Sequence, residues 1–249
     1  MGKSGNRQVQ FKQFTVRDDR CAMKVGTDAL ILGAWCDVEE ATSVLDIGSG
    51  SAIVTLMIAQ RAPGARVIAV ELERIAFGQG CENVAQSPFM GQIQCIHQSI
   101  QEFSNETRWQ GSFDVVVSNP PFFHGKPKSP DAARNLARHD DTLAITDLLD
   151  SAKRCMRPLG RFILVWPEER RVELFEAAQL RGFSLAREMT IQGSPEHVST
   201  RFLSEWSYDN AIEPQRDAMS IEKGRRIDGQ VVLTDRYIRL MRPYVLALD

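Results

Sequence analysis

The chain has few cysteines and histidines, and their spacing fits neither a metal site nor a disulfide framework. Its five cysteines are an odd number, lie far apart and include no C-x-x-C pair, and the four histidines show no metal-ligand spacing. We therefore expect no bound metal and no disulfide. The thiols are expected to be small buried hydrophobes in a reducing, cytoplasmic setting.

Long apolar runs are also missing. A membrane-spanning helix needs roughly 18 or more apolar residues, and the best runs here are residues 52–59 and 162–166. The first seven residues are basic and polar, with no apolar stretch behind them, which argues against a secretory signal. We expect residues 1–10 to be a flexible tail and the protein to have no membrane contact.

Neither sign of charge is in excess over the whole chain. The 30 Lys and Arg against 32 Asp and Glu give a net charge of −2 and a pI near 6.1. A protein that binds nucleic acid over its whole surface would be more basic, so any RNA site must be local. Basic residues gather in three places: Lys3, Arg7, Lys12, Arg17, Arg20 and Lys24; Lys126, Lys128, Arg134 and Arg138; and Arg225, Arg226, Arg236, Arg239 and Arg242.

What the sequence does contain is an alternation of apolar, strand-like runs with helical stretches. The expected strands are residues 43–47, 66–71, 93–96, 113–118 and 161–166, and the expected helices are 51–61, 73–86, 146–156 and 168–180. Such alternation predicts an α/β fold with a mostly parallel sheet and helices on both of its faces.

Two later strand-like runs, residues 184–191 and 201–208, have no long helix between them. We expect them to pair antiparallel at the sheet edge, which gives seven strands in all. Residues 238–248 are expected to form a short helix. The charged segment 123–141 has no apolar period and reads as a long loop, a kind of segment that is often functional.

A glycine-containing loop follows the first strand. Glycines at Gly48 and Gly50 let the backbone approach a ligand at the start of the next helix. A dinucleotide site would have a third glycine where this chain has Ile53, and Asp46 is unfavourable beside a pyrophosphate, so a dehydrogenase is disfavoured. Glu71 ends the second strand and can accept hydrogen bonds from two ribose hydroxyls. The combination predicts S-adenosylmethionine as the cofactor.

The tetrapeptide Asn119-Pro120-Pro121-Phe122 follows the apolar strand 113–118. Asn offers a carbonyl oxygen as an acceptor, and the prolines stiffen the turn and leave its carbonyls free. Phe offers a flat face for stacking. This segment therefore predicts a site that holds a planar amine.

These motifs resemble the class I, Rossmann-like S-adenosylmethionine-dependent methyltransferases that methylate amines, whose signature is [Asp/Asn/Ser]-Pro-Pro-[Tyr/Phe/Trp]. The resemblance runs from about Phe11 to the end. The stretches 23–35 and 118–139 are similar, more specifically, to the bacterial tRNA1(Val) adenine-N6 methyltransferases, which modify adenine 37 beside the anticodon. The resemblance implies one class I methyltransferase domain over residues 11–249, with residues 11–40 covering the cofactor, acting as a monomer on a tRNA anticodon loop.

The resemblance also assigns roles to residues. Lys24, Thr27 and Asp28 line or close the cofactor pocket. Thr27 or Asp28 could instead cap the helix that follows, and the two roles can coexist. Related enzymes usually have an Asp where this chain has Ser99, so Gln98 is a possible substitute for the adenine contact. The expected cofactor-binding set is Lys24, Thr27, Asp28, Asp46, Gly48, Gly50, Glu71, Ser99 and Asn119.

The expected catalytic residues are Asn119, Pro120 and Phe122. The Asn119 side-chain oxygen and the Pro120 carbonyl accept the two N–H groups of the adenine amine, and Phe122 stacks on the extruded base. Positioning and preorganised acceptors, not a strong base, supply the catalysis. The expected substrate-binding residues are Pro121, Phe123, Lys126, Lys128, Arg138 and His139.

Three other enzymes share the tetrapeptide: guanine-N2 methyltransferases of ribosomal RNA, glutamine-N5 methyltransferases of release factors, and DNA adenine methyltransferases. The chain has no target-recognition domain for DNA, and no duplicated or extra domain of the kind that guanine enzymes often have. Only about 40 residues precede the first strand, where glutamine enzymes usually carry a helical domain. A non-catalytic RNA-binding protein on this fold would be marked by a damaged glycine loop or a lost Asn, and both are intact here.

Overall fold

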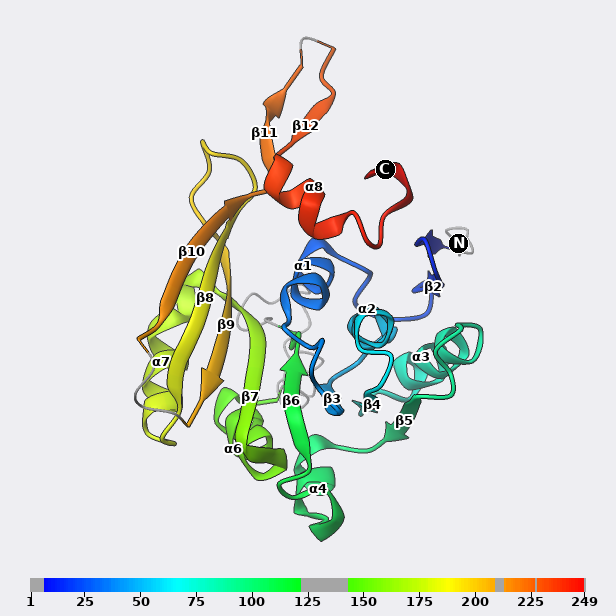
Figure 1. The fold of residues 1–249 in the computed structure, drawn as a ribbon, viewed down its shortest axis with the longest axis vertical. Coiled ribbons are helices and arrows are strands. Elements are labelled where there is room, and N and C mark those ends of the chain that lie inside the picture. Colours follow the sequence, from blue (N-terminus) through cyan, green and yellow to red (C-terminus); the bar gives the residue numbers. More distant parts are fainter. Residues whose placement is uncertain (1–6, 122–142, 209–212, 227, 249) are drawn as a thin grey trace, which may run out of the picture.

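A single large sheet organises the molecule. The structure, a computed structural model, describes residues 7–121, 143–208, 213–226 and 228–248. Within these residues eight strands form a sheet in the order β10-β8-β9-β7-β6-β3-β4-β5 (Figure 1). Its strands are β3 (Ser43–Ile47), β4 (Arg66–Glu71), β5 (Ile93–His97), β6 (Phe113–Ser118), β7 (Met156–Pro167), β8 (Ser184–Gln192), β9 (Arg201–Ser207) and β10 (Gln215–Ser220).

Helices cover both faces of this sheet. They are α1 (Thr27–Trp35), α2 (Ile53–Arg61), α3 (Arg74–Ala85), α4 (Ile100–Asn105), α6 (Ile145–Cys155), α7 (Arg171–Gln179) and α8 (Asp235–Met241), with short 3₁₀ turns η1 (Thr107–Trp109), η2 (Glu168–Arg170) and η3 (Leu246–Leu248). None of the helices in the described part of the chain is long and apolar enough to cross a membrane. The expected α/β fold with a mostly parallel sheet is confirmed.

Successive side chains of a central strand point to opposite faces of the sheet, and this alternation produces the two layers of the core. Val115 and Val117 of β6 pack with α1, α2 and α8, whereas Val116 between them packs with α4, α6 and α7 on the other face. All three valines are fully buried. A strand buried on both faces reads as a continuous apolar run, which is why the sequence revealed it.

The sheet differs from the expectation in two respects. It has eight strands rather than seven, because β10 adds to β8 in a parallel direction. The antiparallel strand is not at the edge: β9 lies between β7 and β8 and runs antiparallel to both. The sequence of β10 is polar and four of its six residues are exposed, so it carries no apolar strand signal.

The helix expected at residues 238–248 begins earlier and ends sooner. The Thr234 side chain caps α8 by accepting the backbone N–H of Tyr237, so the helix starts at Asp235. It ends at Met241, two residues before Pro243, which cannot continue a helix.

Two small sheets flank the main one. β1 (Gln8–Gln10) pairs antiparallel with β2 (Thr15–Arg17), so residues 8–10 of the expected tail belong to a strand. β11 (Glu222–Arg225) pairs antiparallel with β12 (Val231–Leu233).

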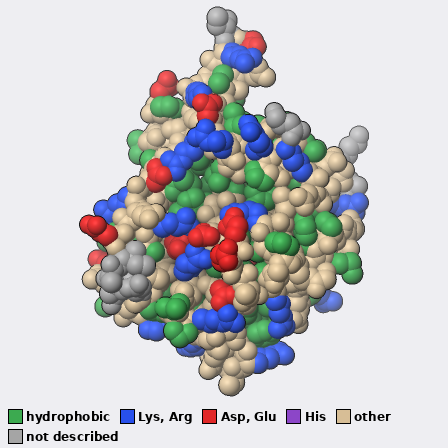
Figure 2. Space-filling view, viewed as in Figure 1, with side chains coloured by type: hydrophobic (Ala, Val, Ile, Leu, Met, Phe, Trp, Pro, Cys, Tyr) green, Lys and Arg blue, Asp and Glu red, His purple; other side chains and the backbone are tan. Residues whose placement is uncertain are grey.

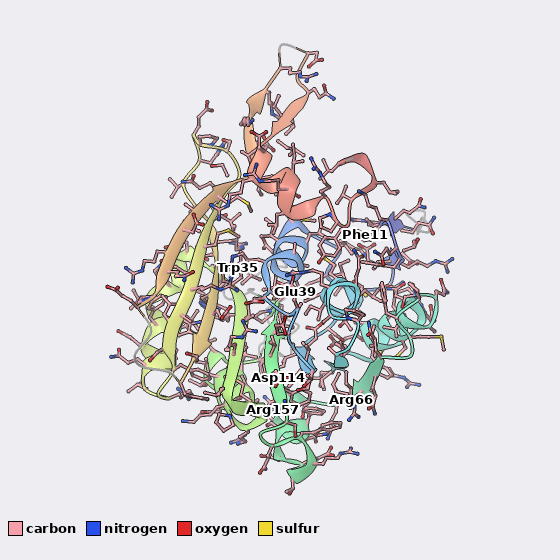
Figure 3. The ribbon with its side chains drawn as sticks, viewed as in Figure 1. Phe11, Trp35, Glu39, Arg66, Asp114 and Arg157 are labelled. Carbon is pink, nitrogen blue, oxygen red and sulfur yellow. The ribbon has the colours of Figure 1, made fainter. Side chains whose placement is uncertain are left out.

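A polar cluster fixes β3 beside β6 at their amino ends. The Asp114 carboxylate accepts hydrogen bonds from the Thr42 backbone N–H at 2.8 Å and the Thr42 hydroxyl at 2.7 Å. Arg157 pairs with the same carboxylate, and the two side chains lie together at the lower end of β6 in Figure 3. These bonds hold the pKa of Asp114 down, to about 2, although partial burial opposes the shift. The register of β3 on β6 sets where their carboxyl ends meet, and the cavity lies there.

Candidate functional site

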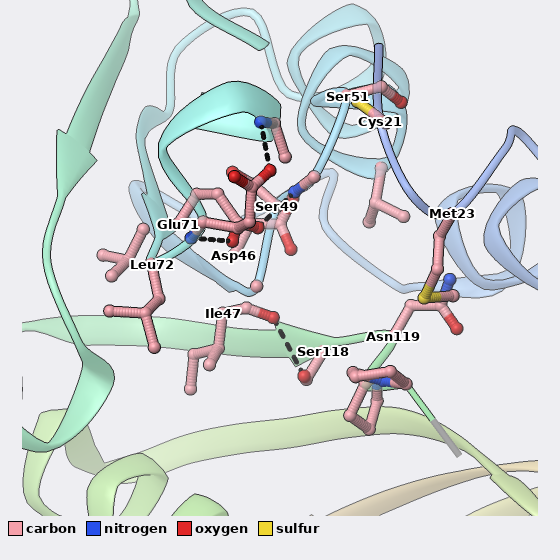
Figure 4. Close-up of a pocket in the computed structure, with 18 of the residues that line it drawn as sticks. Cys21, Met23, Asp46, Ile47, Ser49, Ser51, Glu71, Leu72, Ser118 and Asn119 are labelled. Carbon is pink, nitrogen blue, oxygen red and sulfur yellow. Dashed lines mark hydrogen bonds between the residues drawn. The ribbon is translucent and has the colours of Figure 1, made fainter. Parts of the chain in front are cut away.

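A cavity of about 370 Å³ lies at the carboxyl ends of β3, β4 and β6 (Figure 4). Ligands of open α/β sheets bind at this edge, because loops that follow parallel strands converge there. Eight of the residues singled out from the sequence line the cavity: Lys24, Asp46, Gly48, Gly50, Glu71, Asn119, Pro120 and Pro121.

Hydrogen bonds fix the glycine loop between β3 and α2 beside the end of β4. Gly48 and Gly50 have φ values of 71° and 55°, in the left-handed region that favours glycine. The Gly50 N–H donates to Glu71 Oε2 at 2.8 Å, and the Glu73 N–H donates to Glu71 Oε1 at 2.8 Å. A carboxylate has about four acceptor positions, so Glu71 fixes the loop and keeps capacity for a ligand.

Helix α3 packs directly against this loop. A Cβ atom built on Gly80 would lie 2.8 Å from the Gly50 carbonyl oxygen, closer than real Cβ atoms approach backbone. Gly80 is therefore needed for close helix packing, although its own backbone is ordinary helix. This contact ties the position of the cavity wall to α3.

Asp46 is a buried carboxylate in the cavity wall. Its exposed fraction is 1%, and the Thr55 hydroxyl donates to its Oδ2 at 2.5 Å. Burial raises the pKa of Asp46 to about 7, and the charge of Glu71 acts in the same direction, while the Thr55 bond opposes them. Positive charge in the cavity would favour the ionised form.

Asn119 brings an unsatisfied acceptor to the cavity. The Ser118 hydroxyl donates to the Ile47 carbonyl at 2.9 Å, which fixes the end of β6 against β3. The next side chain, Asn119, has its Oδ1 atom buried and without a hydrogen-bond partner among the described residues. An unmade hydrogen bond at a buried polar atom costs about 1–3 kcal/mol. This arrangement suits an acceptor that binds a hydrogen-bond donor of a ligand.

One wall of the cavity comes from the segment 21–24, which precedes α1. Lys24 does not extend freely into the cavity: its Nζ atom donates to the carbonyls of Asp18 (2.8 Å), Asp19 (3.0 Å) and Cys21 (2.8 Å). The ammonium thus closes the loop 18–24 on itself and shapes the wall.

Two buried amides of α3, Gln79 and Asn83, fasten this segment, and the sequence reasoning missed both. Their exposed fractions are 0% and 2%. Gln79 Oε1 accepts the N–H groups of Arg20 and Cys21, both at 3.0 Å, and its Nε2 donates to Asp19 Oδ1 at 2.7 Å.

Asn83 acts in the same way one turn further along α3. Its Oδ1 accepts the Arg17 N–H at 2.9 Å, and its Nδ2 donates to the carbonyls of Arg17 (2.8 Å) and Ser51 (2.9 Å). The sequence did contain one indication of this role: the two amides are four residues apart, so they share one face of the helix. Which segment they bind depends on the tertiary fold.

Three expected cofactor ligands are placed outside the residues that line the cavity. Thr27 and Asp28 begin α1, whose N-cap is Gly26 with no side-chain capping bond, and Asp28 pairs with Arg201 at 3.2 Å. Ser99 is the N-cap of α4, where its hydroxyl accepts the Glu102 N–H at 3.2 Å. The neighbouring Gln98, considered as its substitute, does line the cavity.

The remaining predicted residues, Phe122, Phe123, Lys126, Lys128, Arg138 and His139, lie outside the described residues. In the part of the chain that the structure does describe, no group of three or more His, Cys, Asp or Glu is placed to hold a metal ion.

Sequence comparison finds relatives over nearly the whole chain. Residues 22–183 match the family model "Methyltransferase small domain". A tRNA1(Val) (adenine(37)-N6)-methyltransferase of Dyadobacter fermentans is 41% identical over 214 residues, covering 84% of this chain and 88% of the relative. The enzyme of that name from Phocaeicola vulgatus is 40% identical over 243 residues, covering 97% and 98%.

Solved structures share the fold at low sequence identity. A predicted O-methyltransferase from Agrobacterium tumefaciens superposes with a TM-score of 0.68 at 16% identity, covering 87% of this chain and 96% of its own. The TYW2 protein of P. horikoshii, solved in complex with MeSAdo, has a TM-score of 0.58 at 13% identity, with coverage of 84% and 74%.

Proposed function

Since the chain belongs to the methyltransferase small domain family, and within it to the tRNA1(Val) (adenine(37)-N6)-methyltransferases, we propose that it methylates the N6 amine of adenine 37 in tRNA1(Val). The methyl donor is S-adenosylmethionine. The observation that carries the proposal is the buried Asn119 Oδ1 beside the glycine loop, which has no hydrogen-bond partner among the described residues. An exocyclic amine is the kind of donor that such an acceptor lacks.

The residues that line the cavity fit this cofactor. A volume of about 370 Å³ lies in the usual range of small-molecule sites, roughly 300–1,000 Å³. Glu71 has acceptor capacity for ribose hydroxyls, and Asp46 provides a buried carboxylate for a cation. When bound, S-adenosylmethionine supplies an electrophilic methyl group on a positively charged sulfur.

The chain's own contribution to the reaction is acceptor geometry. Asn119 Oδ1 and the Pro120 carbonyl accept the two N–H bonds of the adenine amine, which directs the nitrogen lone pair toward the cofactor. Because prolines fix φ and lack an N–H, Pro120 and Pro121 hold these acceptors rigidly. The rate enhancement comes from positioning and preorganised dipoles, and no residue needs to act as a strong base.

The RNA partner of this site is the anticodon loop of the tRNA. Bases of a loop are unstacked at low cost, so adenine 37 can be extruded into the site. Within this proposal Phe122 stacks on the base, and Phe123, Lys126, Lys128, Arg138 and His139 hold nearby RNA. We propose that the enzyme works as a monomer in the cytoplasm.

The test is methyl transfer from S-adenosylmethionine to tRNA1(Val) transcripts, read out as N6-methyladenosine by mass spectrometry. Asn119→Ala should lower kcat by on the order of 10²–10³, with cofactor binding changed only a few-fold. Asn119→Asp, which keeps an acceptor oxygen at the same place, should retain more activity than Asn119→Ala. If Asn119→Ala is as active as the natural protein, the role of Asn119 is wrong.

The same assay separates the alternative substrates. A transcript with guanine in place of adenine 37 should take up no methyl group. Methylation of that transcript, or of ribosomal RNA or a release factor in preference to tRNA1(Val), would contradict the proposal.

A further inference from the structure

The C-terminal part of the chain concentrates positive charge on a protein that is slightly acidic overall. Residues 215–242 contain seven Lys and Arg against four Asp and Glu, whereas the whole chain has a net charge of −2. These residues form β10, the β11–β12 hairpin and α8. Figure 2 shows Lys and Arg side chains gathered over α8 and the base of the hairpin.

Several of these basic groups have no acidic partner in the part of the chain that the structure describes. Lys223 pairs with Asp235 at 2.9 Å, and Arg236 pairs with Asp217. Among the described residues, by contrast, no carboxylate lies within 4.0 Å of the basic atoms of Arg225, Arg226, Arg239 and Arg242, and all four residues are exposed. Arg226 donates a hydrogen bond to Gln230 Oε1 at 3.1 Å, which leaves its charge uncompensated. Four exposed arginines without an acidic partner among the described residues create a local positive potential.

The hairpin contributes little to the core. Within the described residues β11 and β12 pair only with each other, and Val231 is 36% exposed. An isolated two-stranded hairpin is only marginally stable in water, so a gain in stability does not explain why the chain has this hairpin. In Figure 1 it projects beyond α8, away from the main sheet.

The topology places this projection at the edge of the sheet that carries the cavity. β10 is parallel to β8, and both β8 and β7 are antiparallel to β9, so β10 runs in the same direction as β6. The hairpin begins at Glu222, directly after β10 ends at Ser220, on the carboxyl-end side.

The strand spacing gives the lateral distance between the hairpin and β6. β10 is four strand steps from β6, or roughly 19 Å at about 4.8 Å per step. Sheet twist of about 20–25° per strand turns β10 away from β6 by on the order of 90°. The hairpin is therefore beside the cavity rather than over it, out of reach of the target base but within reach of RNA that flanks it.

We infer that the β11–β12 hairpin and α8 bind the phosphate backbone of the tRNA stem that flanks the target loop. The inference rests on the proposed function, which puts an RNA loop at Asn119. An RNA stem is a polyanion, and exposed arginines on the hairpin and α8 can bind its phosphates without reading its sequence. This surface would supply affinity, while the cavity supplies the choice of base.

The test compares Arg225→Gln/Arg226→Gln with a control that removes the same charge at the opposite edge of the sheet, Arg108→Gln/Arg154→Gln. Arg108 and Arg154 are exposed and lie near the amino ends of β6 and β7. The hairpin variant should raise KM for full-length tRNA by on the order of tenfold, with kcat unchanged. The slope of log affinity against log salt should fall by about 1.4–1.8, at 0.7–0.9 per lost phosphate contact. The control variant should match the natural protein.

Two substrates separate this inference from the proposed function. On a short loop oligonucleotide without the stem, the hairpin variant and the natural protein should have the same KM. If the natural protein methylates the tRNA and the hairpin variant shows the same KM and salt slope as the control, the hairpin does not bind RNA. An equal loss of affinity in both variants would also overturn the inference, because it would reflect net charge alone. If the natural protein methylates neither RNA, the proposed function fails.

Discussion

Replacing Gln79 by Met should weaken cofactor binding more than it impairs chemistry. The change keeps the side chain's size but removes its acceptor and its donor. The N–H groups of Arg20 and Cys21 then lose their shared acceptor, and Asp19 loses a donor. Cys21 is only 3% exposed, so its N–H must stay unsatisfied, at a cost of about 1–3 kcal/mol, or the segment must detach from α3.

The consequence for the cofactor follows from the position of that segment. Residues 21–24 line the cavity. In the Gln79→Met protein this segment must first return to its position against α3 before the cofactor can bind. A reordering cost of about 1–3 kcal/mol corresponds to a dissociation constant about 5–150-fold higher. At saturating cofactor and RNA, kcat should stay within a few-fold, because Asn119 and the prolines are untouched.

Calorimetric titration with S-adenosylhomocysteine measures this effect directly. Gln86→Met serves as the control, since Gln86 is exposed at the C-terminal end of the same helix. Gln79→Glu keeps the acceptor but sets a carboxylate against Asp19, and the further change Asp19→Asn should restore binding by returning a donor. A Gln79→Met protein that melts at a lower temperature yet binds S-adenosylhomocysteine with unchanged affinity would refute the reasoning.

Two further predictions concern the cavity wall. Gly80→Ala should destabilise the protein by about 1–3 kcal/mol and weaken S-adenosylhomocysteine binding, because its Cβ would meet the Gly50 carbonyl at 2.8 Å. Gly78→Ala in the same helix meets nothing within 4 Å and should instead stabilise the protein by up to about 1 kcal/mol in urea unfolding. The folded-state pKa of Asp46 is raised from 3.8 to about 7. Between these two pH values the folded protein keeps a proton that the unfolded chain has lost. The contribution of Asp46 to the free energy of unfolding therefore falls by about 4 kcal/mol as the pH rises from 3.8 to about 7. Asp46→Asn should remove this loss. Equal pH dependence of unfolding in the variant and the natural protein would show that the Asp46 pKa is not raised.

The position of the cavity could be predicted from the sequence because parallel-sheet geometry is simple. β3, β4 and β6 are buried apolar runs, and their carboxyl ends meet at one edge of the sheet. Polar residues placed directly after such runs, as with Glu71 and Asn119, must therefore come together. Order along the chain was sufficient to predict that both line one cavity.

Contacts between segments could not be predicted in the same way. Gln79 and Asn83 looked like ordinary polar residues of a helix, because nothing local shows that residues 17–21 lie over them. β10 was missed because an exposed edge strand has no need of an apolar face. In both cases the information is in the tertiary arrangement and not in a local pattern.

Asn119 and Ser99 show why a polar residue after a strand keeps a free acceptor at one place and caps a helix at another. Both follow parallel strands at the same sheet edge. Ser99 has a partner nearby because it is the N-cap of α4: its hydroxyl accepts the Glu102 N–H at 3.2 Å and donates to the Glu102 carboxylate at 2.9 Å. An Asn side-chain oxygen can accept the backbone N–H two residues ahead, as in an Asx turn. Here Pro120 and Pro121 have no N–H to offer, so the oxygen of Asn119 stays without a partner in the described structure. The prolines therefore do more than stiffen the turn: they leave the Asn119 acceptor free, as the proposed binding of a substrate amine requires.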